Sequence, residues 1–133
     1  MCVFCKIING EIPSKKIYED NDVLAILDLS QIGKGHTLVL PKAHYENILD
    51  IPNDIYSKVM EKAKYLANVI NKTYNPDGLN ILNNCKEAAG QSVMHFHVHI
   101  IPRYKNDDFG FKEANHQGLY DLDEVRNDLI KNI

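Results

Sequence analysis

Apolar and polar residues follow two periodicities along the chain, and each predicts a type of secondary structure. Between positions 51 and 74, apolar residues recur at helical spacing and polar residues fill the opposite face, which predicts one long amphipathic helix. Pro52 suits its first turn, Asn53 or Asp54 is expected to cap it, and "NPDG" ends it. The predicted apolar face consists of Ile55, Val59, Ala63, Leu66 and Ile70.

Five shorter apolar segments are bounded by turn residues or proline, and these predict strands. They span residues 16–20, 22–29, 37–40, 79–84 and 92–102. A short helix is predicted over 121–133, where Asp121 and Glu124 have capping-box spacing, and the stretch from Arg103 to Tyr120 is expected to be mainly loop. Because strands linked by turns surround a single long helix, we expect an α+β protein with an antiparallel sheet.

Composition narrows the class of protein without identifying it. A chain of 133 residues can form one domain with its own core, so 1–133 is expected to be a single domain. The net charge of −3 gives no electrostatic reason to expect binding to nucleic acid or to an anionic membrane, and no apolar run could cross a bilayer. The N-terminal stretch "MCVFCKIINGEIP" lacks the pattern of a secretory signal, so we expect a cytoplasmic protein with reduced thiols.

The most unusual stretch of the chain is "SVMHFHVHIIPRY", which places His95, His97 and His99 at alternate positions. In an extended strand, the three imidazoles would share one face and the intervening apolar residues would share the other. Three interpretations compete: a structural strand with a polar face, a metal site, and nucleophilic or acid–base catalysis on phosphate. The spacing alone does not decide between metal binding and catalysis.

Several blocks, in a fixed order, resemble the histidine triad (HIT) family of nucleotide hydrolases and transferases. "QSVMHFHVHIIPR" resembles the signature His-φ-His-φ-His-φ-φ, in which φ is apolar, and "FCKIINGEIPSKKIYEDNDVLAILDLSQIGKGHTLVLPKAHYENI" resembles the N-terminal half of the family. The resemblance covers residues 2–104, which we take as the domain core, and leaves 105–133 as a C-terminal extension. It implies an antiparallel five-stranded sheet with one long helix and a short C-terminal helix, and the sheet extends across a homodimer.

The resemblance also implies a role for each histidine of the triad. His97 is the nucleophile that attacks the α-phosphorus of an adenosine nucleotide, and water then hydrolyses the nucleotidyl-histidine. His99 hydrogen-bonds the phosphate, His95 orients the site, Ser92 offers a hydroxyl near the leaving group, and His36 lies close to the triad. No metal is required for this chemistry, because protein donors can stabilise the phosphoryl charge. The implied nucleotide-binding residues are Phe4, Ile7, Asp28, Leu29, Asn83, Gln91, Ser92, His97 and His99.

The cysteines raise a separate question. Cys2 and Cys5 form a C-x-x-C pair, which in an intracellular protein indicates zinc or redox chemistry. No thioredoxin-like pattern surrounds the pair, so zinc is favoured, with two free thiols as the alternative. A zinc site needs further ligands, and His44 and His95 are the candidates for a tetrahedral structural Zn²⁺ site, as in the bacterial-type members that the sequence resembles here. Cys85 has no partner.

The resemblance therefore implies an enzyme: a histidine triad hydrolase that acts on adenosine phosphoramidates or related nucleotides and binds a purine nucleotide of the AMP type. A dinucleoside polyphosphate hydrolase is the alternative within the same class, because "HIIPR" resembles that branch. A nucleotide-binding regulatory protein with little turnover is the alternative from another class. The complete triad argues against it, since a pure binder could lose the nucleophile.

Overall fold

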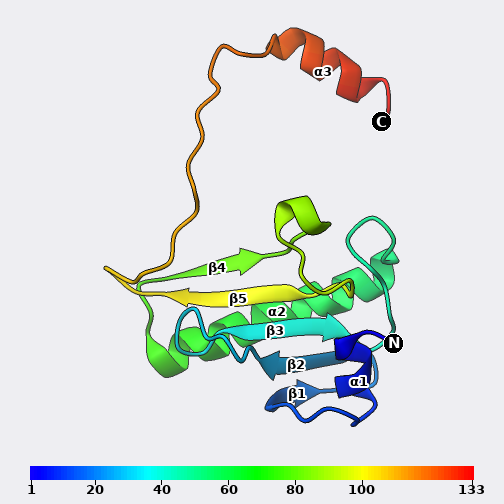
Figure 1. The fold of residues 1–133 in the computed structure, drawn as a ribbon, viewed down its shortest axis with the longest axis vertical. Coiled ribbons are helices and arrows are strands. Elements are labelled where there is room, and N and C mark those ends of the chain that lie inside the picture. The colour runs from blue at the N-terminus through cyan, green and yellow to red at the C-terminus, as the bar shows by residue number, and fades with distance from the viewer.

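The computed structural model describes all 133 residues, and at its centre is an antiparallel sheet of five strands (Figure 1). The strand order β1-β2-β3-β5-β4 places β5 inside the sheet and β4 at an edge. The α+β class, the five antiparallel strands and the single long helix are therefore confirmed. The elements are α1 (Val3–Ile8), β1 (Lys16–Glu19), β2 (Val23–Leu27), β3 (Thr37–Pro41), α2 (Asn53–Tyr74), β4 (Gly78–Leu82), the 3-10 helix η1 (Glu87–Ala89), β5 (Val98–Arg103) and α3 (Leu122–Ile130).

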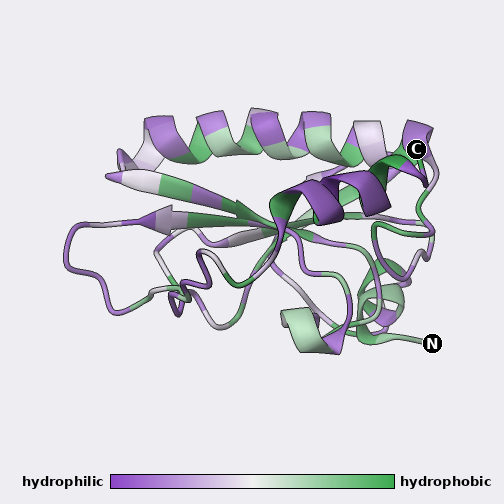
Figure 2. Ribbon diagram, turned by 90° about the horizontal axis from the view of Figure 1, so that it is seen from above, coloured by the Kyte–Doolittle hydropathy of each residue, from purple (hydrophilic) through white to green (hydrophobic).

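Helix α2 covers one face of the sheet, while α1 and η1 lie on the opposite side (Figure 2). The predicted apolar face of α2 is the one that packs: Val59, Ala63, Leu66 and Ile70 are all buried. Each such side chain contributes about 1.5–3 kcal/mol of transfer free energy when it leaves water. None of the helices combines the length and the hydropathy needed to cross a bilayer.

Strand β2 shows why the sheet is covered on both sides. Its residues alternate between the two faces, and Val23, Leu24, Ala25 and Ile26 are all buried. Val23 and Ala25 belong to the cluster beneath α2, whereas Leu24 and Ile26 pack on the other face with Phe4 of α1. The second face is the one on which the histidines of the triad project.

The segment that carries the histidines becomes a strand later than predicted. β5 starts at Val98 instead of residue 92 and continues through Pro102, so that His99 lies within it while His95 and His97 precede it. The pairing between β5 and β3 reaches only Val98, and the N–H of Phe96 donates instead to the carbonyl of Tyr45, at 2.6 Å. This hydrogen bond to Tyr45 thus takes the place of pairing with β3 in the segment that carries His95 and His97.

The termini of α2 also differ in part from the prediction. Pro52 is the N-cap residue, and no side chain caps the helix, so that the expected capping by Asn53 or Asp54 is wrong. Proline is tolerated at this position because it has no backbone N–H, and an N–H at the start of a helix would have no intrahelical acceptor. The helix ends where predicted, since Asn75 takes a left-handed conformation with φ of 47°.

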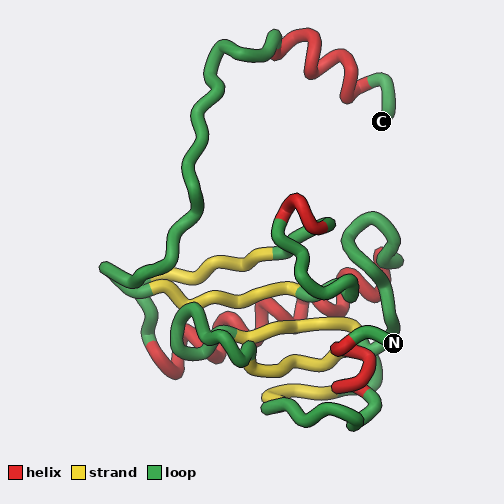
Figure 3. Tube along the Cα trace, viewed as in Figure 1, coloured by secondary structure: helices red, strands yellow, loops and turns green.

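After β5, the chain runs as a long loop to α3, as Figure 3 shows in green and red. The predicted loop is confirmed from Tyr104 to Tyr120, whereas Arg103 still belongs to β5, and the predicted C-terminal helix is confirmed over Leu122–Ile130. The Asp121 carboxylate caps α3 by accepting the N–H groups of Asp123 and Glu124. No residue of α3 is buried.

The loop between β2 and β3 passes so close to β5 that only glycine fits at position 33. A Cβ on Gly33 would lie 2.1 Å from the carbonyl oxygen of Pro102. Gly33→Ala should therefore push this loop away and lower the free energy of unfolding by about 1–3 kcal/mol, the usual cost of overpacking. Urea unfolding would measure the change.

Gly78→Ala is the matched control, because nothing lies within 4 Å of a Cβ at that position. Its unfolding midpoint should stay near that of the unmodified chain. Equal midpoints for the two variants would show that the close approach of the loop to β5 is wrong.

Candidate active site

A cavity of about 230 Å³ opens on the face of the sheet that carries α1. It lies between α1, the carboxyl end of β2, β3 and the segment that leads into β5. Seven of the nine nucleotide-binding residues implied by the family resemblance meet here, from α1, the end of β2 and the segment 92–99. The residues that line it are Val3, Phe4, Ile7, Ile26, Leu27, Asp28, Leu29, Leu38, Ser92, Val93, His97 and His99.

His97 is held in one protonation state by its surroundings. Its Nδ1 lies 2.7 Å from the carbonyl oxygen of His95, and because a carbonyl can only accept, Nδ1 carries the proton. Burial lowers the pKa of His97 below its usual value, although this hydrogen bond and the charge of Asp28 oppose the shift. The imidazole is therefore neutral near pH 7, and its Nε2 keeps a free lone pair at the cavity.

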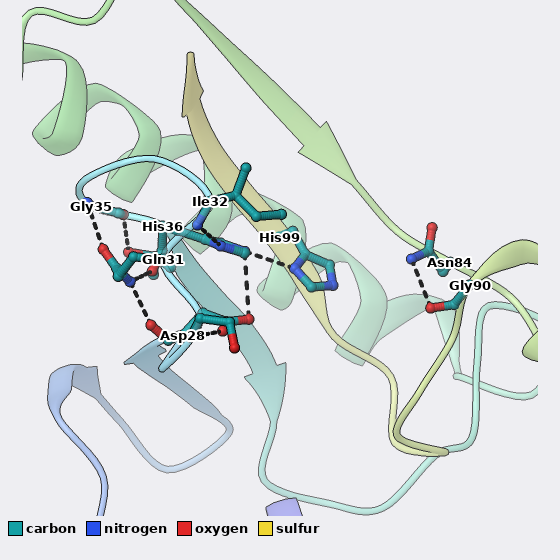
Figure 4. Close-up of polar contacts among 10 residues, drawn as sticks. Asp28, Gln31, Ile32, Gly35, His36, Asn84, Gly90 and His99 are labelled. Carbon is teal, nitrogen blue, oxygen red and sulfur yellow. Dashed lines mark hydrogen bonds and ion pairs between the residues drawn. The ribbon is translucent and has the colours of Figure 1, made fainter. Parts of the chain in front are cut away.

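His99 is held in the opposite tautomer by a chain of contacts (Figure 4). The N–H of Ile32 donates to Nδ1 of His36 at 3.3 Å, so the neutral ring of His36 carries its proton on Nε2. That Nε2 lies 2.9 Å from Nδ1 of His99 and 3.6 Å from the carboxylate of Asp28. His99 then accepts at Nδ1 and carries its own proton on Nε2.

The two neighbouring imidazoles thus offer different groups to a ligand. His97 offers a lone pair, and His99 offers an N–H, with their ring centroids 5.0 Å apart. Burial lowers the pKa of His99 to about 4, with further contributions from His97 and His36, so that His99 is also neutral. A nucleophile beside a hydrogen-bond donor is the arrangement that attack on a phosphoryl group requires.

Two of the implied nucleotide-binding residues lie behind the cavity instead of lining it. The side-chain amide of Asn83 donates to the carbonyl oxygen of His97 at 2.9 Å. Gln91 is buried, and its side-chain amide donates to the carbonyl oxygens of Glu46 and Val93. Both residues fix the backbone from which the triad projects.

A second cluster adjoins the triad and consists of Cys2, Cys5, His44 and His95. The six separations between their two Sγ and two Nδ1 atoms run from 3.1 to 3.6 Å. Ligands at ordinary Zn–S and Zn–N distances on a tetrahedron lie about 3.3–3.8 Å apart. The donor set and its spacing fit a four-coordinate zinc ion with no open position.

His95 has the hydrogen bond that a metal-binding histidine usually makes. Its Nε2–H donates to the carbonyl oxygen of Pro41 at 2.7 Å, which leaves Nδ1 free to face Cys2 and Cys5. Burial lowers the pKa of His95, so the ring is neutral, as a metal ligand must be. The side chain of His95 thus faces the cysteines of this cluster, while its backbone carbonyl accepts the hydrogen bond from His97.

Several lining residues were not anticipated from the sequence. Val3 lies on α1, a six-residue helix that was not predicted and that also carries Phe4 and Ile7 to the cavity. Ile26 and Leu38 face each other across β2 and β3. The register of those two strands could have indicated the pair, because both residues lie on the same face as the imidazoles. The remaining unanticipated lining residues are Leu27 and Val93.

The chain is similar to known proteins over most of its length. The family model of the HIT domain matches residues 9–106. The chain is 49% identical over 127 residues to the protein hit of Bacillus subtilis, covering 95% of this chain and 88% of that one. It is 39% identical over 129 residues to adenylylsulfatase HINT3 of Arabidopsis thaliana, covering 97% of this chain and 66% of that one.

Solved structures show the same fold. A HIT family protein from Bacillus subtilis superposes with a TM-score of 0.93 at 46% identity, covering 99% of this chain and 96% of that one. One from Bacillus anthracis gives 0.90 at 48% identity, covering 98% and 95%. A zinc-bound histidine triad family protein from Mycobacterium smegmatis gives 0.77 at 36% identity, covering 87% and 84%.

Proposed function

Because this chain belongs to the HIT domain family, we propose that it is a hydrolase that cleaves the α-phosphate linkage of an adenosine nucleotide through a nucleotidyl-histidine on His97. The observation that carries the proposal is the hydrogen bond from Nδ1–H of His97 to the carbonyl oxygen of His95, at 2.7 Å. It leaves the Nε2 lone pair of a neutral imidazole facing a cavity whose lining is mostly apolar and also includes the polar side chains of Asp28, Ser92 and His99.

The proposed reaction has two displacements at phosphorus. The Nε2 lone pair of His97 forms an N–P bond while the leaving group departs with the electron pair of the broken bond. Water then attacks the same phosphorus, its hydroxyl stays on AMP, and the N–P electron pair returns to His97. In sum, one water is consumed and its remaining proton ends on the leaving group. The His99 Nε2–H stabilises the charge on the phosphoryl oxygens in both steps.

The cavity walls suggest how the nucleotide lies. Phe4, Ile7 and Leu29 offer apolar contact to the base, and Asp28 offers carboxylate oxygens to the ribose hydroxyls. Ser92 lines the cavity beside the triad, where its hydroxyl can hydrogen-bond the leaving group. Asn83 and Gln91 would contribute through the backbone of the triad segment.

The leaving group is the finer part of the proposal. We favour an amine, as in an adenosine phosphoramidate, and one relative, HINT3, is named an adenylylsulfatase, so that sulfate is a second candidate. Turnover of adenosine phosphoramidate, adenylyl sulfate and diadenosine polyphosphate by one preparation would rank the three linkages. Binding of AMP without turnover of any of them would instead favour a regulatory nucleotide-binding protein.

We further propose a structural zinc ion at Cys2, Cys5, His44 and His95. The ion would hold α1, and with it the apolar wall of the cavity, against the segment that carries the triad. This zinc ion takes no part in the proposed reaction at His97. We expect the protein to lie in the cytoplasm, where the thiols of the zinc site stay reduced.

Finally, we propose a homodimer formed through β4 and α2. β4 is an edge strand, and an unpaired edge attracts another strand. Ile81 of β4 is 49% exposed. A hollow of about 220 Å³ lies beside it, lined by Met60, Ala63, Lys64, Ala67, Asn68 and Ile81. This surface offers a second copy both apolar contact and a sheet edge.

Mass spectrometry of a rapidly quenched reaction should find an added AMP on the peptide that contains His97. His97→Ala should form no adduct and lose turnover, because the covalent route is gone. His99→Ala removes one donor and should lose about 10²–10³ in kcat, the usual cost of one lost oxyanion donor.

His116→Ala is the control, because this exposed histidine lies far along the chain from the cavity. It should form the adduct and turn over as the unmodified chain does. An adduct on His95 or His99, or near-normal turnover by His97→Ala, would show that the nucleophile is misassigned.

Elemental analysis of protein purified without added metal should find about one zinc per chain. Cys5→Ser should lose the zinc and lower Tm by on the order of 10 °C, because α1 loses its attachment. Cys85→Ser is the matched control and should keep both the zinc and the Tm of the unmodified chain, since Cys85 lies outside the cluster. Zinc-free protein whose melting does not respond to a chelator would refute the site.

Light scattering at micromolar concentration should give twice the chain mass of 15.2 kDa. Ile81→Lys should give the single-chain mass, because a charge would be buried in the interface. Ile17→Lys on the opposite edge strand is the matched control, with 44% exposure against 49%, and should stay dimeric. A single-chain mass for the unmodified protein would contradict the dimer.

A further inference from the structure

A second cavity, of about 270 Å³, lies on the face of the sheet that α2 covers. It is bounded by the C-terminal end of α2, by β1 and by the β2–β3 loop, residues 28–36, and it is larger than the active-site cavity of about 230 Å³. Three of its apolar side chains are open to water, since Ile17, Val69 and Tyr74 are 44%, 41% and 41% exposed. A hollow with apolar walls that water still reaches is the usual form of a ligand site. Its apolar walls are Ile17, Leu27, Val69, Ile70 and Tyr74.

Lys34 is the one charged side chain that lines this cavity. Its ammonium makes no ion pair and lies 5.0 Å from the centroid of the Tyr74 ring. The neutral polar side chains already have partners within the protein. Gln31 bonds to three backbone groups of its own loop, and the hydroxyls of Thr37 and Thr73 donate to backbone carbonyl oxygens. The cavity therefore combines apolar walls with a single uncompensated positive charge.

This combination selects the chemical class of the ligand. The apolar walls require an apolar body, and the charge of Lys34 attracts an anionic group and repels a cation. A doubly charged phosphate would need more than the one cation that the cavity offers, whereas a carboxylate matches it. A second copy of the chain does not cover the cavity in the proposed dimer, because Val69 and Thr73 lie on the opposite side of α2 from Ala67, which lines the hollow beside β4.

The β2–β3 loop contributes to both cavities (Figure 4). Asp28 lines the active-site cavity, and Nε2 of His36 lies 2.9 Å from Nδ1 of His99. Gln31 and Gly35 line the second cavity. The side-chain amide of Gln31 joins the two sides, because it donates to the carbonyl oxygens of Asp28 and His36 at 2.6 and 2.7 Å. A displacement of Gln31 would therefore move both residues that face the active site.

We propose that the second cavity binds a small apolar carboxylate, with the carboxylate on Lys34, and that the bound molecule holds the β2–β3 loop in the position that the active site needs. The loop lies directly on the cavity wall, since a Cβ on Gly35 would be 3.1 Å from the Tyr74 ring. The carboxylate and the nucleotide then favour the same position of the loop, so each strengthens binding of the other. This coupling rests on the proposed nucleotide binding, whereas the carboxylate site does not.

Titration of the ¹⁵N-labelled full chain with octanoate, followed by ¹⁵N–¹H correlation NMR, tests the carboxylate site. The amide signals of Gln31, Gly35 and Thr37 should shift together, because these residues line the cavity. Octylammonium has a tail of the same length and the opposite charge, and it should bind at least about tenfold more weakly, because Lys34 repels it. The absence of shifts at these amides, or equal binding of the two probes, would refute the site.

Two variants of the full chain test the charge and the space separately. Lys34→Met keeps an apolar stem and should raise the octanoate Kd by about fivefold, the usual effect of one partly exposed ion pair. Lys112→Met, at an exposed lysine outside the cavity, is the matched control and should leave the Kd unchanged.

Val69→Trp fills the cavity and should abolish the octanoate shifts. Val125→Trp is its matched control, because Val125 has the same 41% exposure but lies on α3, and it should bind octanoate as the unmodified chain does. An unchanged octanoate Kd in Lys34→Met, or in folded Val69→Trp, would contradict the proposal.

Calorimetric titration with AMP measures the coupling between the two cavities. Saturating octanoate should lower the Kd of AMP by about fivefold, and saturating AMP should lower the Kd of octanoate by the same factor, because a coupling free energy is reciprocal. In Val69→Trp, octanoate should leave the Kd of AMP unchanged. A Kd of AMP that octanoate does not alter in the unmodified chain would refute the coupling. Failure of AMP to bind at all would instead refute the proposed nucleotide site, and the octanoate shifts would still decide the carboxylate site.

Discussion

The hydrogen bond from His97 to the backbone carbonyl of His95 is the contact on which the proposed chemistry depends. It fixes the proton on Nδ1 of His97 and so leaves the opposite nitrogen free. The same residue, His95, directs its side chain to Cys2 and Cys5, with its other ring nitrogen bonded to Pro41. One residue therefore links the candidate zinc site, the sheet and the nucleophile, and a shift of His95 would disturb all three.

The alternation of side chains around β5 explains how such polar residues are tolerated in the interior. Phe96, Val98 and Ile100 join the cluster beneath α2, while the imidazoles lie on the face that α1 covers. Burial keeps the imidazoles neutral by lowering their pKa values, and each ring has a hydrogen-bond partner that offsets the cost of leaving water. The same burial that stabilises the sheet thus sets the protonation states that the proposed reaction needs.

Sequence patterns were sufficient for the elements that have a strong periodicity of their own. The spacing of Val59, Ala63 and Leu66 was enough to predict α2, and alternating segments were enough to predict the strands. Helix α1 was not predicted, because its six residues are held by contacts with residues distant in sequence, above all those of Cys2 and Cys5 with His95. β5 starts late because Phe96 bonds to Tyr45, a partner that no local pattern reveals.

The candidate site was predicted in part for a similar reason. The family resemblance indicated which residues belong to it, and the cavity brings most of them together. The spacing of the three histidines could not separate their roles, because tautomers depend on backbone partners such as Ile32 and the carbonyl of His95. Those partners become visible only in the folded chain, and they account for the different groups that His97 and His99 offer.

The central claim is that His97 is a neutral imidazole with its proton on Nδ1 and a free Nε2. Long-range ¹⁵N–¹H correlation NMR of protein labelled at histidine distinguishes the two neutral tautomers from the imidazolium. At pH 7, His97 should show a protonated Nδ1 and an unprotonated Nε2, whereas His99 should show the reverse. A proton on Nε2 of His97, or an imidazolium at that position, would contradict the account.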